Sequence, residues 1–260
     1  MLYTSAAMET SASGGVRFQV ASDQSLLVYF DPTEKRSRVS RSAGINVATP
    51  LQNQISIEGH EQVRRLLRLL ELEPVAGVRN LHPAYSSILI KFDALKLRHE
   101  ELEEVLRRHI TRLKKVALPK PRLVEIPVCY SEEFGPDLKD VAKLHKLALE
   151  RVIELHRSTT YIVYFLGFVP GFAYLGELPE ELATPRLPMP RKSVPPGSVG
   201  IAGTQTGVYP ISTPGGWRLL GRTPLAMFRP ERAEMSLLAI GDRVRFVPIS
   251  REQFVKLENA

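Results

Sequence analysis

Residues 165–229 read FLGFVPGFAYLGELPEELATPRLPMPRKSVPPGSVGIAGTQTGVYPISTPGGWRLLGRTPLAMFR, and this stretch decides the fold. Glycine and proline recur every few residues and leave runs of about four to six residues that could form strands. Short apolar strands separated by so many turn residues favour a compact β-barrel or sandwich over a helical domain.

Polar and aromatic side chains lie beside these glycines. Glycine lets a backbone approach a ligand closely, arginine offers planar donors suited to carboxylate or phosphate, and tyrosine and tryptophan add apolar faces with polar tips. Such a set suits recognition of an anionic amide or acyl phosphate without covalent bond formation. The residues predicted to line a substrate or partner groove are Phe168, Phe172, Tyr174, Arg186, Arg191, Ser198, Gln205, Thr206, Tyr209, Trp217, Arg222 and Thr223.

A purely structural role is the alternative for these positions. The glycines and prolines would then only shape turns, and the aromatic side chains would pack the barrel. For Arg222 the structural alternative is a clamp on the Gly215–Gly216 turn, in place of a contact to a ligand or partner.

Catalytic motifs are missing from the sequence. It has no GxxxxGK[ST] phosphate-binding loop, and the Gly197–Gly200 segment lacks the spacing of a nucleophile elbow. No histidine follows His156, and no histidine pairs with a carboxylate motif at metal-ligand spacing. We therefore expect no metal site and assign no catalytic residue.

The segments GFVPGFAYLG (167–176) and PRLPMPRKSVPPGSVGIAGTQTGVYPISTPGGWRLLGRTP (185–224) resemble the KipI / allophanate hydrolase subunit 1 family. The resemblance implies a cyclophilin-like β-barrel, a module that also forms half of the carboxyltransferase region of urea carboxylases. Where that family often has Phe-Asp-Pro, this chain has Phe228-Arg229-Pro230. A cation replaces a carboxylate there, so this chain lacks any role that the acid has elsewhere.

The resemblance also implies a function. It predicts the B-type subunit of an ATP-dependent 5-oxoprolinase, which opens 5-oxo-L-proline to L-glutamate together with an A subunit and a C subunit of the KipA / allophanate hydrolase subunit 2 type. ATP, with Mg, would bind together with the partner subunit, and this chain alone would hold no cofactor. The alternatives are a KipI-like inhibitor of a sensor histidine kinase and a carboxyltransferase subunit of the allophanate hydrolase or urea carboxylase type.

The patterns predict an α+β chain of two domains. We expect a disordered N-terminus at 1–15 and a small ferredoxin-like α/β domain at 16–118. In that domain a strand at 16–30, with a polar interruption at Ser22–Ser25, is followed by a flexible insertion at 31–54, a helix at 58–72, a turn and strand at 77–92, and a helix at 99–115. The apolar face of the first helix is predicted to consist of Val63, Leu66, Leu67 and Leu70. Two prolines within 116–122 mark a linker.

The second domain is predicted to be the cyclophilin-like β-barrel at 119–250. Its strand from Leu123 precedes a helical stretch at 137–156 with a break near Leu147–Ala148, a strand at 161–167, the glycine-rich stretch and a closing strand at 237–249. Residues 251–260 are expected to form a C-terminal tail.

Composition limits the classes of function. The 260 residues are 43% hydrophobic with a formal net charge of +7, which suits an anionic ligand or an acidic partner surface. The basic residues are scattered, so we expect no nucleic acid partner. Cys129 is the only cysteine, which excludes an internal disulfide. With no apolar span or signal peptide pattern, a cytoplasmic location is expected and a membrane is not.

Overall fold

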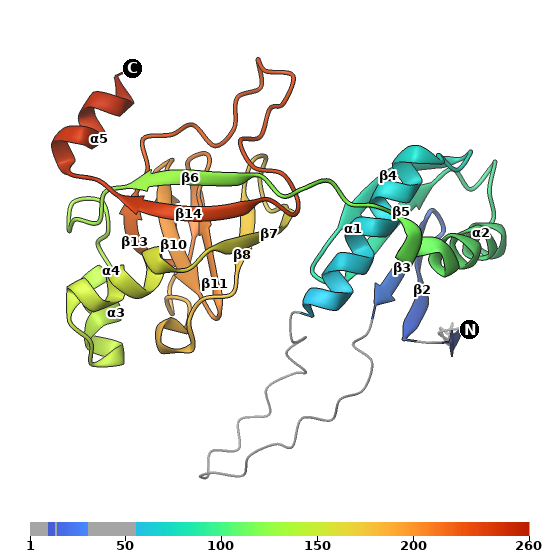
Figure 1. Ribbon diagram of the computed structural model, residues 1–260, viewed down its shortest axis with the longest axis horizontal. Helices are drawn as coiled ribbons and strands as arrows, with labels where there is room; N and C mark the ends of the chain where they lie inside the picture. The colour runs from blue at the N-terminus through green and yellow to red at the C-terminus, as the bar shows by residue number, and fades with distance from the viewer. Residues whose placement is uncertain (1–9, 14, 31–55, 260) are drawn as a thin grey trace, which may run out of the picture. The chain divides into compact units, whose positions relative to one another are not determined.

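The computed structural model describes residues 10–13, 15–30 and 56–259, and the chain divides into two compact units, Met1–Pro119 and Lys120–Ala260 (Figure 1). Each unit is described by itself. The expected insertion at 31–54 lies outside the described residues, as does most of 1–15. Thr10–Ser13, which we expected to be disordered, forms a strand that pairs with Val16 and Phe18.

The N-terminal unit is an antiparallel sheet with two helices packed against it. Its elements are β1 (Thr10–Ser13), β2 (Val16–Ser22), β3 (Ser25–Phe30), α1 (Ile57–Leu72), β4 (Val78–Pro83), β5 (Ser87–Phe92) and α2 (His99–Arg112), followed by a 3₁₀ turn at Leu113–Lys115. The strand order is β1-β2-β3-β5-β4. Side chains from both helices and from the sheet form one core.

Two predicted strands are hairpins in the structure. At the polar interruption of the first, Ser22 Oγ accepts from Gln24 N at 3.2 Å and lies 2.6 Å from Ser25 Oγ. These local bonds make a turn, so β2 and β3 pair with each other and the prediction of one strand at 16–30 is wrong. The stretch at 77–92 likewise folds into the β4–β5 hairpin, where we predicted a turn and one strand.

Helix α1 follows its sequence pattern closely. Ser56 Oγ accepts from Gly59 N at 3.0 Å and caps the helix at its start. Val63, Leu66 and Leu70 are buried and Leu67 packs partly buried against the same core, which confirms the predicted apolar face.

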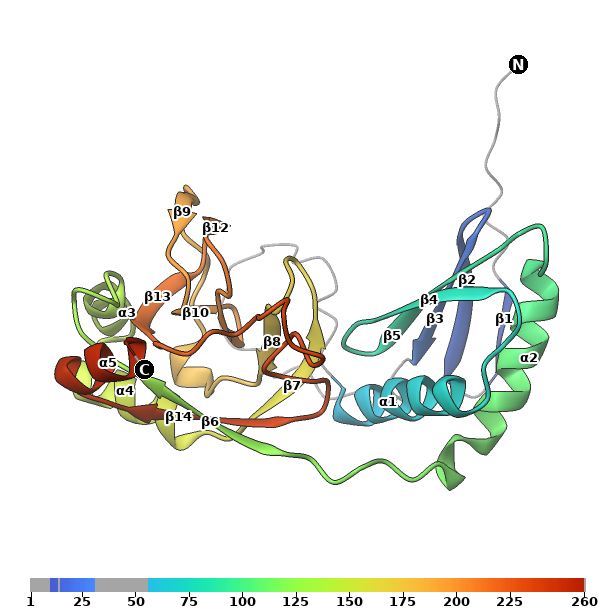
Figure 2. The same cartoon turned by 90° about the horizontal axis from the view of Figure 1, so that it is seen from above.

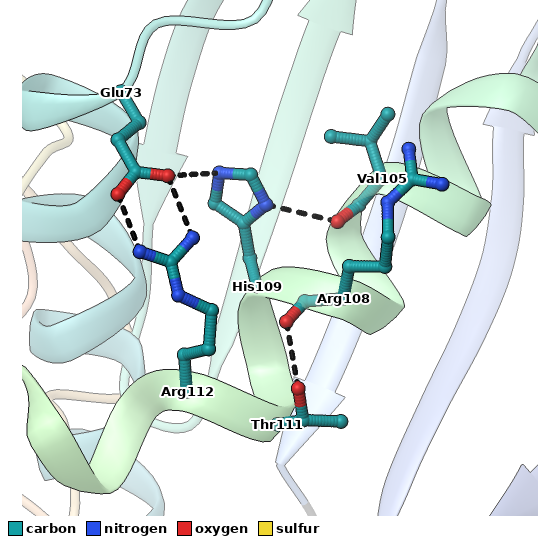
Figure 3. A network of polar contacts seen from close by, with 6 residues as sticks. All are labelled: Glu73, Val105, Arg108, His109, Thr111 and Arg112. Atoms are coloured by element: carbon teal, nitrogen blue, oxygen red, sulfur yellow. Dashed lines mark hydrogen bonds and ion pairs between the residues drawn. The ribbon is translucent and has the colours of Figure 1, made fainter.

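The end of α1 is tied to α2 by an ion pair (Figure 3). Arg112 Nη1 and Nη2 donate to the two Glu73 oxygens at 2.8 and 2.6 Å, and His109 Nε2 lies 3.8 Å from the same carboxylate. The Arg112 hydrogen bonds lower the pKa of Glu73. His109 Nδ1 donates to Val105 O at 2.9 Å within α2. The C-terminal end of α2, just before the 3₁₀ turn, is therefore bonded both to Glu73 after α1 and to the preceding turn of its own helix.

The C-terminal unit is a seven-stranded sheet that nearly closes on itself. Its elements are β6 (Leu123–Val128), α3 (Leu138–His145), α4 (Leu149–Ser158), β7 (Tyr161–Leu166), β8 (Ala173–Gly176), a 3₁₀ turn at Glu180–Leu182, β9 (Arg191–Val194), β10 (Ser198–Ala202), β11 (Gln205–Val208), β12 (Thr213–Gly215), β13 (Arg218–Arg222), β14 (Arg243–Pro248) and α5 (Arg251–Glu258). The strand order is β13-β10-β11-β8-β7-β14-β6, and β9 and β12 form a separate ribbon (Figure 2).

The two edges of this sheet meet just beyond β6. Cys129 N donates to Arg222 O at 2.9 Å, and Arg222 N donates to Cys129 O at 3.2 Å. The end of β13 therefore bonds to the residue after β6, and the sheet closes into a barrel at this point. The β6–β14 pair is parallel, whereas the other pairs of this sheet are antiparallel.

Helices α3 and α4 cover the main core of the unit. Lys146, with φ 55°, ends α3 in the left-handed conformation, and α4 starts at Leu149, so the predicted break near 147–148 is confirmed. The residues predicted as a C-terminal tail include α5, which has a capping box at Ser250. The buried ring of Phe254 stacks on Phe134 at 4.4 Å and holds this helix to the unit.

Candidate functional site

One face of the barrel sheet carries five aromatic side chains, which we call the aromatic cluster: Phe168, Phe172, Tyr174, Tyr209 and Trp217. Glycine makes room for it on β11, because a Cβ on Gly207 would lie 3.1 Å from Phe172 Cζ and 3.2 Å from Trp217 Cζ3. The neighbours of Gly207 in the strand, Thr206 and Val208, are buried on the opposite face. The strand thus separates the cluster from the main core.

Phe172 is the centre of the cluster. Its ring meets the others edge to face, with centroid distances of 5.0 Å to Tyr174, 5.3 Å to Tyr209, 5.4 Å to Trp217 and 5.6 Å to Phe168. These are favourable aromatic geometries. Phe172, Tyr209 and Trp217 are buried, whereas Phe168 is 60% exposed. The structure therefore brings the five predicted aromatic residues together but leaves one ring largely in solvent.

The tyrosines of the cluster stay neutral at physiological pH. Burial raises the pKa of the Tyr174 and Tyr209 phenols, and the positive charge of Arg186 opposes the shift in both. Arg186 is exposed and forms no hydrogen bond or ion pair with another described residue. The cluster thus combines apolar faces and neutral phenols with a cation that is available to a ligand.

A hollow of about 430 Å³ opens beside Phe168. It is lined by Leu166, Gly167, Phe168, Val169, Pro170, Gly171, Phe228 and Ser236. Its wall is the loop between β7 and β8, in which Gly167 N donates to Phe172 O at 3.0 Å and Phe172 N donates to Val169 O at 3.1 Å. Phe228, which the sequence analysis did not include in the groove, supplies the other side.

Arg191 is engaged in an ion pair within the unit. Its Nη2 donates to Asp137 Oδ1 at 2.6 Å, while Asp137 Oδ2 accepts from Leu219 N at 2.7 Å. Arg191 Nη1 also lies 3.4 Å from Trp217 O. Asp137 is 4% exposed, so this carboxylate joins β9, β13 and the start of α3. Nothing in the sequence pairs residues 137 and 191, and the position of Asp137 before a helix suggests only a cap.

Arg222 holds the turn that precedes β10. Its Nε donates to Pro196 O at 2.8 Å, and its guanidinium lies 5.8 Å from the Phe254 ring centroid. The same turn is bonded through Gly197, whose N–H donates to Tyr209 O at 2.7 Å and whose carbonyl accepts from Thr223 N at 2.9 Å. The structural alternative placed the Arg222 contact at the Gly215–Gly216 turn, which is wrong, because the guanidinium bonds to Pro196 in the turn before β10.

A buried chain of hydrogen bonds passes through Thr206. Its hydroxyl donates to Gly200 O at 3.1 Å and lies 2.9 Å from His156 Nε2, while Tyr130 Oη lies 2.7 Å from His156 Nδ1. One arrangement satisfies all three contacts: Tyr130 donates to Nδ1, and Nε2–H donates to Thr206. Burial lowers the pKa of His156 to about 3, so the ring is neutral. This histidine stabilises the fold and does not face a ligand.

The remaining predicted residues are held by the barrel. Ser198 is buried, and its carbonyl accepts from Tyr209 N at 2.9 Å. Thr223 Oγ1 accepts from Leu225 N at 3.2 Å. Gln205 begins β11 opposite Gly176 and is half-buried. The predicted set therefore divides into the aromatic cluster with Arg186 and a group of residues with contacts inside the unit.

Two absences apply to the part of the chain that the structure describes. Its histidine, cysteine, aspartate and glutamate side chains form no group of three or more that could hold a metal ion. None of the helices in it has the length and apolar character needed to cross a membrane.

The chain belongs to the family of the carboxyltransferase domain, subdomain C and D, whose model matches residues 36–238. Its curated relatives include the 5-oxoprolinase B subunit of Bacillus subtilis, 46% identical over 76% of this chain and 88% of the relative. The 5-oxoprolinase B subunit of Escherichia coli O157:H7 is 58% identical over 50% of this chain and 60% of the relative. These matches confirm the resemblance seen in the sequence.

Solved structures agree on the fold. TTHA0988 is 39% identical with a TM-score of 0.66, over 75% of this chain and 38% of that chain. The urea carboxylase of Kluyveromyces lactis superposes with a TM-score of 0.69 over 96% of this chain and 23% of its own, at 18% identity, which shows a shared fold alone. This chain thus spans less than half the length of either solved chain.

Proposed function

We propose that this chain is the B subunit of an ATP-dependent 5-oxoprolinase, which opens 5-oxo-L-proline to L-glutamate. The observation that carries the proposal is the 46% identity to the 5-oxoprolinase B subunit of Bacillus subtilis over 88% of that relative. The partners would be an A subunit and a C subunit of the KipA / allophanate hydrolase subunit 2 type. A subunit role accounts for a chain whose sequence contains no complete catalytic motif.

The fold proposal follows the same family. The nearly closed sheet of the C-terminal unit supports a cyclophilin-like barrel at 119–250, since its edges bond at Cys129 and Arg222. Two helices against one antiparallel sheet support a ferredoxin-like domain at 16–118.

Within this reaction the half-buried Tyr174 of the aromatic cluster and the exposed Arg186, whose charge acts on its phenol, are our candidates for contact with substrate. The substrate is a small lactam ring that carries a carboxylate. The apolar face of Tyr174 suits the ring, and the planar guanidinium of Arg186 suits the carboxylate. Arg191 and Arg222 are less suited to this role, because their guanidinium groups already bond to Asp137 and Pro196.

The described residues do not fit a Mg–ATP site by themselves. The sequence has no phosphate-binding loop, and the described acidic side chains form no group that could hold a metal. We therefore assign ATP and Mg to a site made with a partner subunit and assign no phosphate transfer step to this chain.

Reconstitution tests the proposal. The purified chain alone should not hydrolyse 5-oxoproline, whereas the chain mixed with its A- and C-type subunits should produce glutamate only when ATP is present. Glutamate release by the A and C subunits without this chain, at the full rate, would overturn the proposal. Specific copurification of a sensor histidine kinase, with no effect on oxoprolinase activity, would favour the inhibitor alternative.

A further inference from the structure

Phe168 occupies a conformation that its own side chain disfavours. Its φ is 68°, in the left-handed region, where a residue with a β-carbon is strained and glycine is not. The ring is 60% exposed, and one edge-to-face contact with Phe172 accompanies it. Neither burial nor backbone preference explains a phenylalanine here. Strained residues of this kind concentrate at binding and active sites.

The surface around this ring is shaped to receive another apolar group. Phe168 forms part of the wall of the hollow of about 430 Å³, with Leu166, Val169 and Phe228 also lining it. The loop is held by Gly171, whose φ is 82° and whose added Cβ would lie 2.6 Å from Phe228 Cβ. The loop that carries the Phe168 ring thus packs closely on Phe228, the residue on the other side of the hollow.

The relatives indicate what covers this surface. In TTHA0988 the segment similar to this chain makes up 38% of one polypeptide, and in the Kluyveromyces lactis urea carboxylase it makes up 23%. Well over half of each chain therefore lies outside the match and is covalently joined to the matching part. These lengths support a second polypeptide, equivalent to that remainder, as the partner that covers this surface.

We propose that Phe168 and the adjoining hollow form the docking surface for that second polypeptide, which inserts an apolar side chain beside the Phe168 ring. The inference rests on the proposed function, in which the occupant is the C-type subunit. A buried aromatic anchor beside a pocket is the usual centre of a protein–protein interface. Phe168 would then become buried only in the complex.

The backbone conformation of Phe168 allows a test that separates docking from folding. Phe168→Gly removes the ring and also removes the backbone strain, and Phe168→Asn places there a residue that tolerates the left-handed region. If Phe168 were needed only for folding, both variants would be clearly less stable than the wild type. For a docking residue, the melting temperature should fall by no more than about 2 °C, while affinity for the C-type subunit falls by about 30-fold or more.

Leu144→Ala is the matched control. Leu144 is an apolar side chain on α3 that is 51% exposed and does not line the hollow. Its substitution should leave the dissociation constant for the C-type subunit within about twofold of the wild type, because lone exposed apolar side chains are common on protein surfaces.

The outcomes are distinct when affinity is measured by calorimetry on the full chain. If the wild type does not bind the C-type subunit, the proposed function fails and this inference fails with it. If the wild type binds and Phe168→Gly binds equally well, only the inference fails. If Phe168→Gly instead converts a wild-type dimer to a monomer in sedimentation, the occupant is a second copy of this chain and the assignment is overturned.

Discussion

Asp137→Ala should destabilise the C-terminal unit by roughly 3 kcal/mol. The substitution removes a charged hydrogen bond from Leu219 N, at 2.7 Å, and an ion pair with Arg191, at 2.6 Å. A hydrogen bond to a charged group contributes about 1.5–3 kcal/mol. The Arg191 side chain is 27% exposed, so its pair adds only about 1 kcal/mol.

The assay can be confined to this unit, because Trp217 is the only tryptophan of the chain and belongs to it. Urea unfolding followed by Trp217 fluorescence gives the free energy of unfolding. Asp140→Ala is the control, since Asp140 is an exposed acid in the first turn of the same helix and should cost less than about 1 kcal/mol.

A double-mutant cycle with Arg191→Ala isolates the ion pair, for which we expect a coupling of about 1 kcal/mol. If Asp137→Ala and Asp140→Ala unfold at the same urea concentration, Asp137 is not the structural junction described here. Arg191 would then be free to act on a ligand.

Burial lowers the pKa of His156 from 6.5 to about 3, so below pH 6.5 the unfolded chain binds a proton that the folded chain does not. Stability should fall by up to about 1.4 kcal/mol per pH unit as the pH drops from 6.5 toward 3. His156→Gln should flatten this slope in urea titrations, and an equal slope would contradict the assignment. Gly197→Ala should cost about 2–3 kcal/mol, because φ is +79° and the new Cβ would lie 2.2 Å from Thr223 O. Gly203→Ala, with φ +56° and open space around it, should cost only about 1 kcal/mol in the same thermal scan. The Cys129 thiol is buried with a raised pKa, so iodoacetamide should label it at least about tenfold more slowly in native than in urea-unfolded protein.

Local patterns predicted the helices well. The apolar residues of α1 recur at helical spacing. Helix α3 ends at His145 and α4 starts at Leu149, on either side of the predicted break. The turn at Ser22–Ser25 was visible as a polar interruption, but the side-chain bonds that reverse the chain there were not inferred. Hairpins were therefore predicted as single strands.

The candidate site was predicted only in part. Aromatic residues near glycines indicated a cluster, and the structure shows why, since Gly207 leaves the space that Phe172 and Trp217 fill. The partners of the polar residues could not be inferred, because they depend on strand register and not on local sequence. Asp137 lies 54 positions from Arg191, and His156 lies 50 positions from Thr206.

The parallel pairing of β6 with β14 also affects how the chain is made. Leu123, at the start of the C-terminal unit, pairs with Arg243 near its end. A ribosome that adds about 5–20 residues per second needs roughly 10 s to synthesise the chain between these partners. During that interval β6 has emerged without the strand that pairs with it, and an unpaired strand edge is prone to aggregation. Chaperone binding to the nascent chain should therefore begin at β6 and end when β14 emerges.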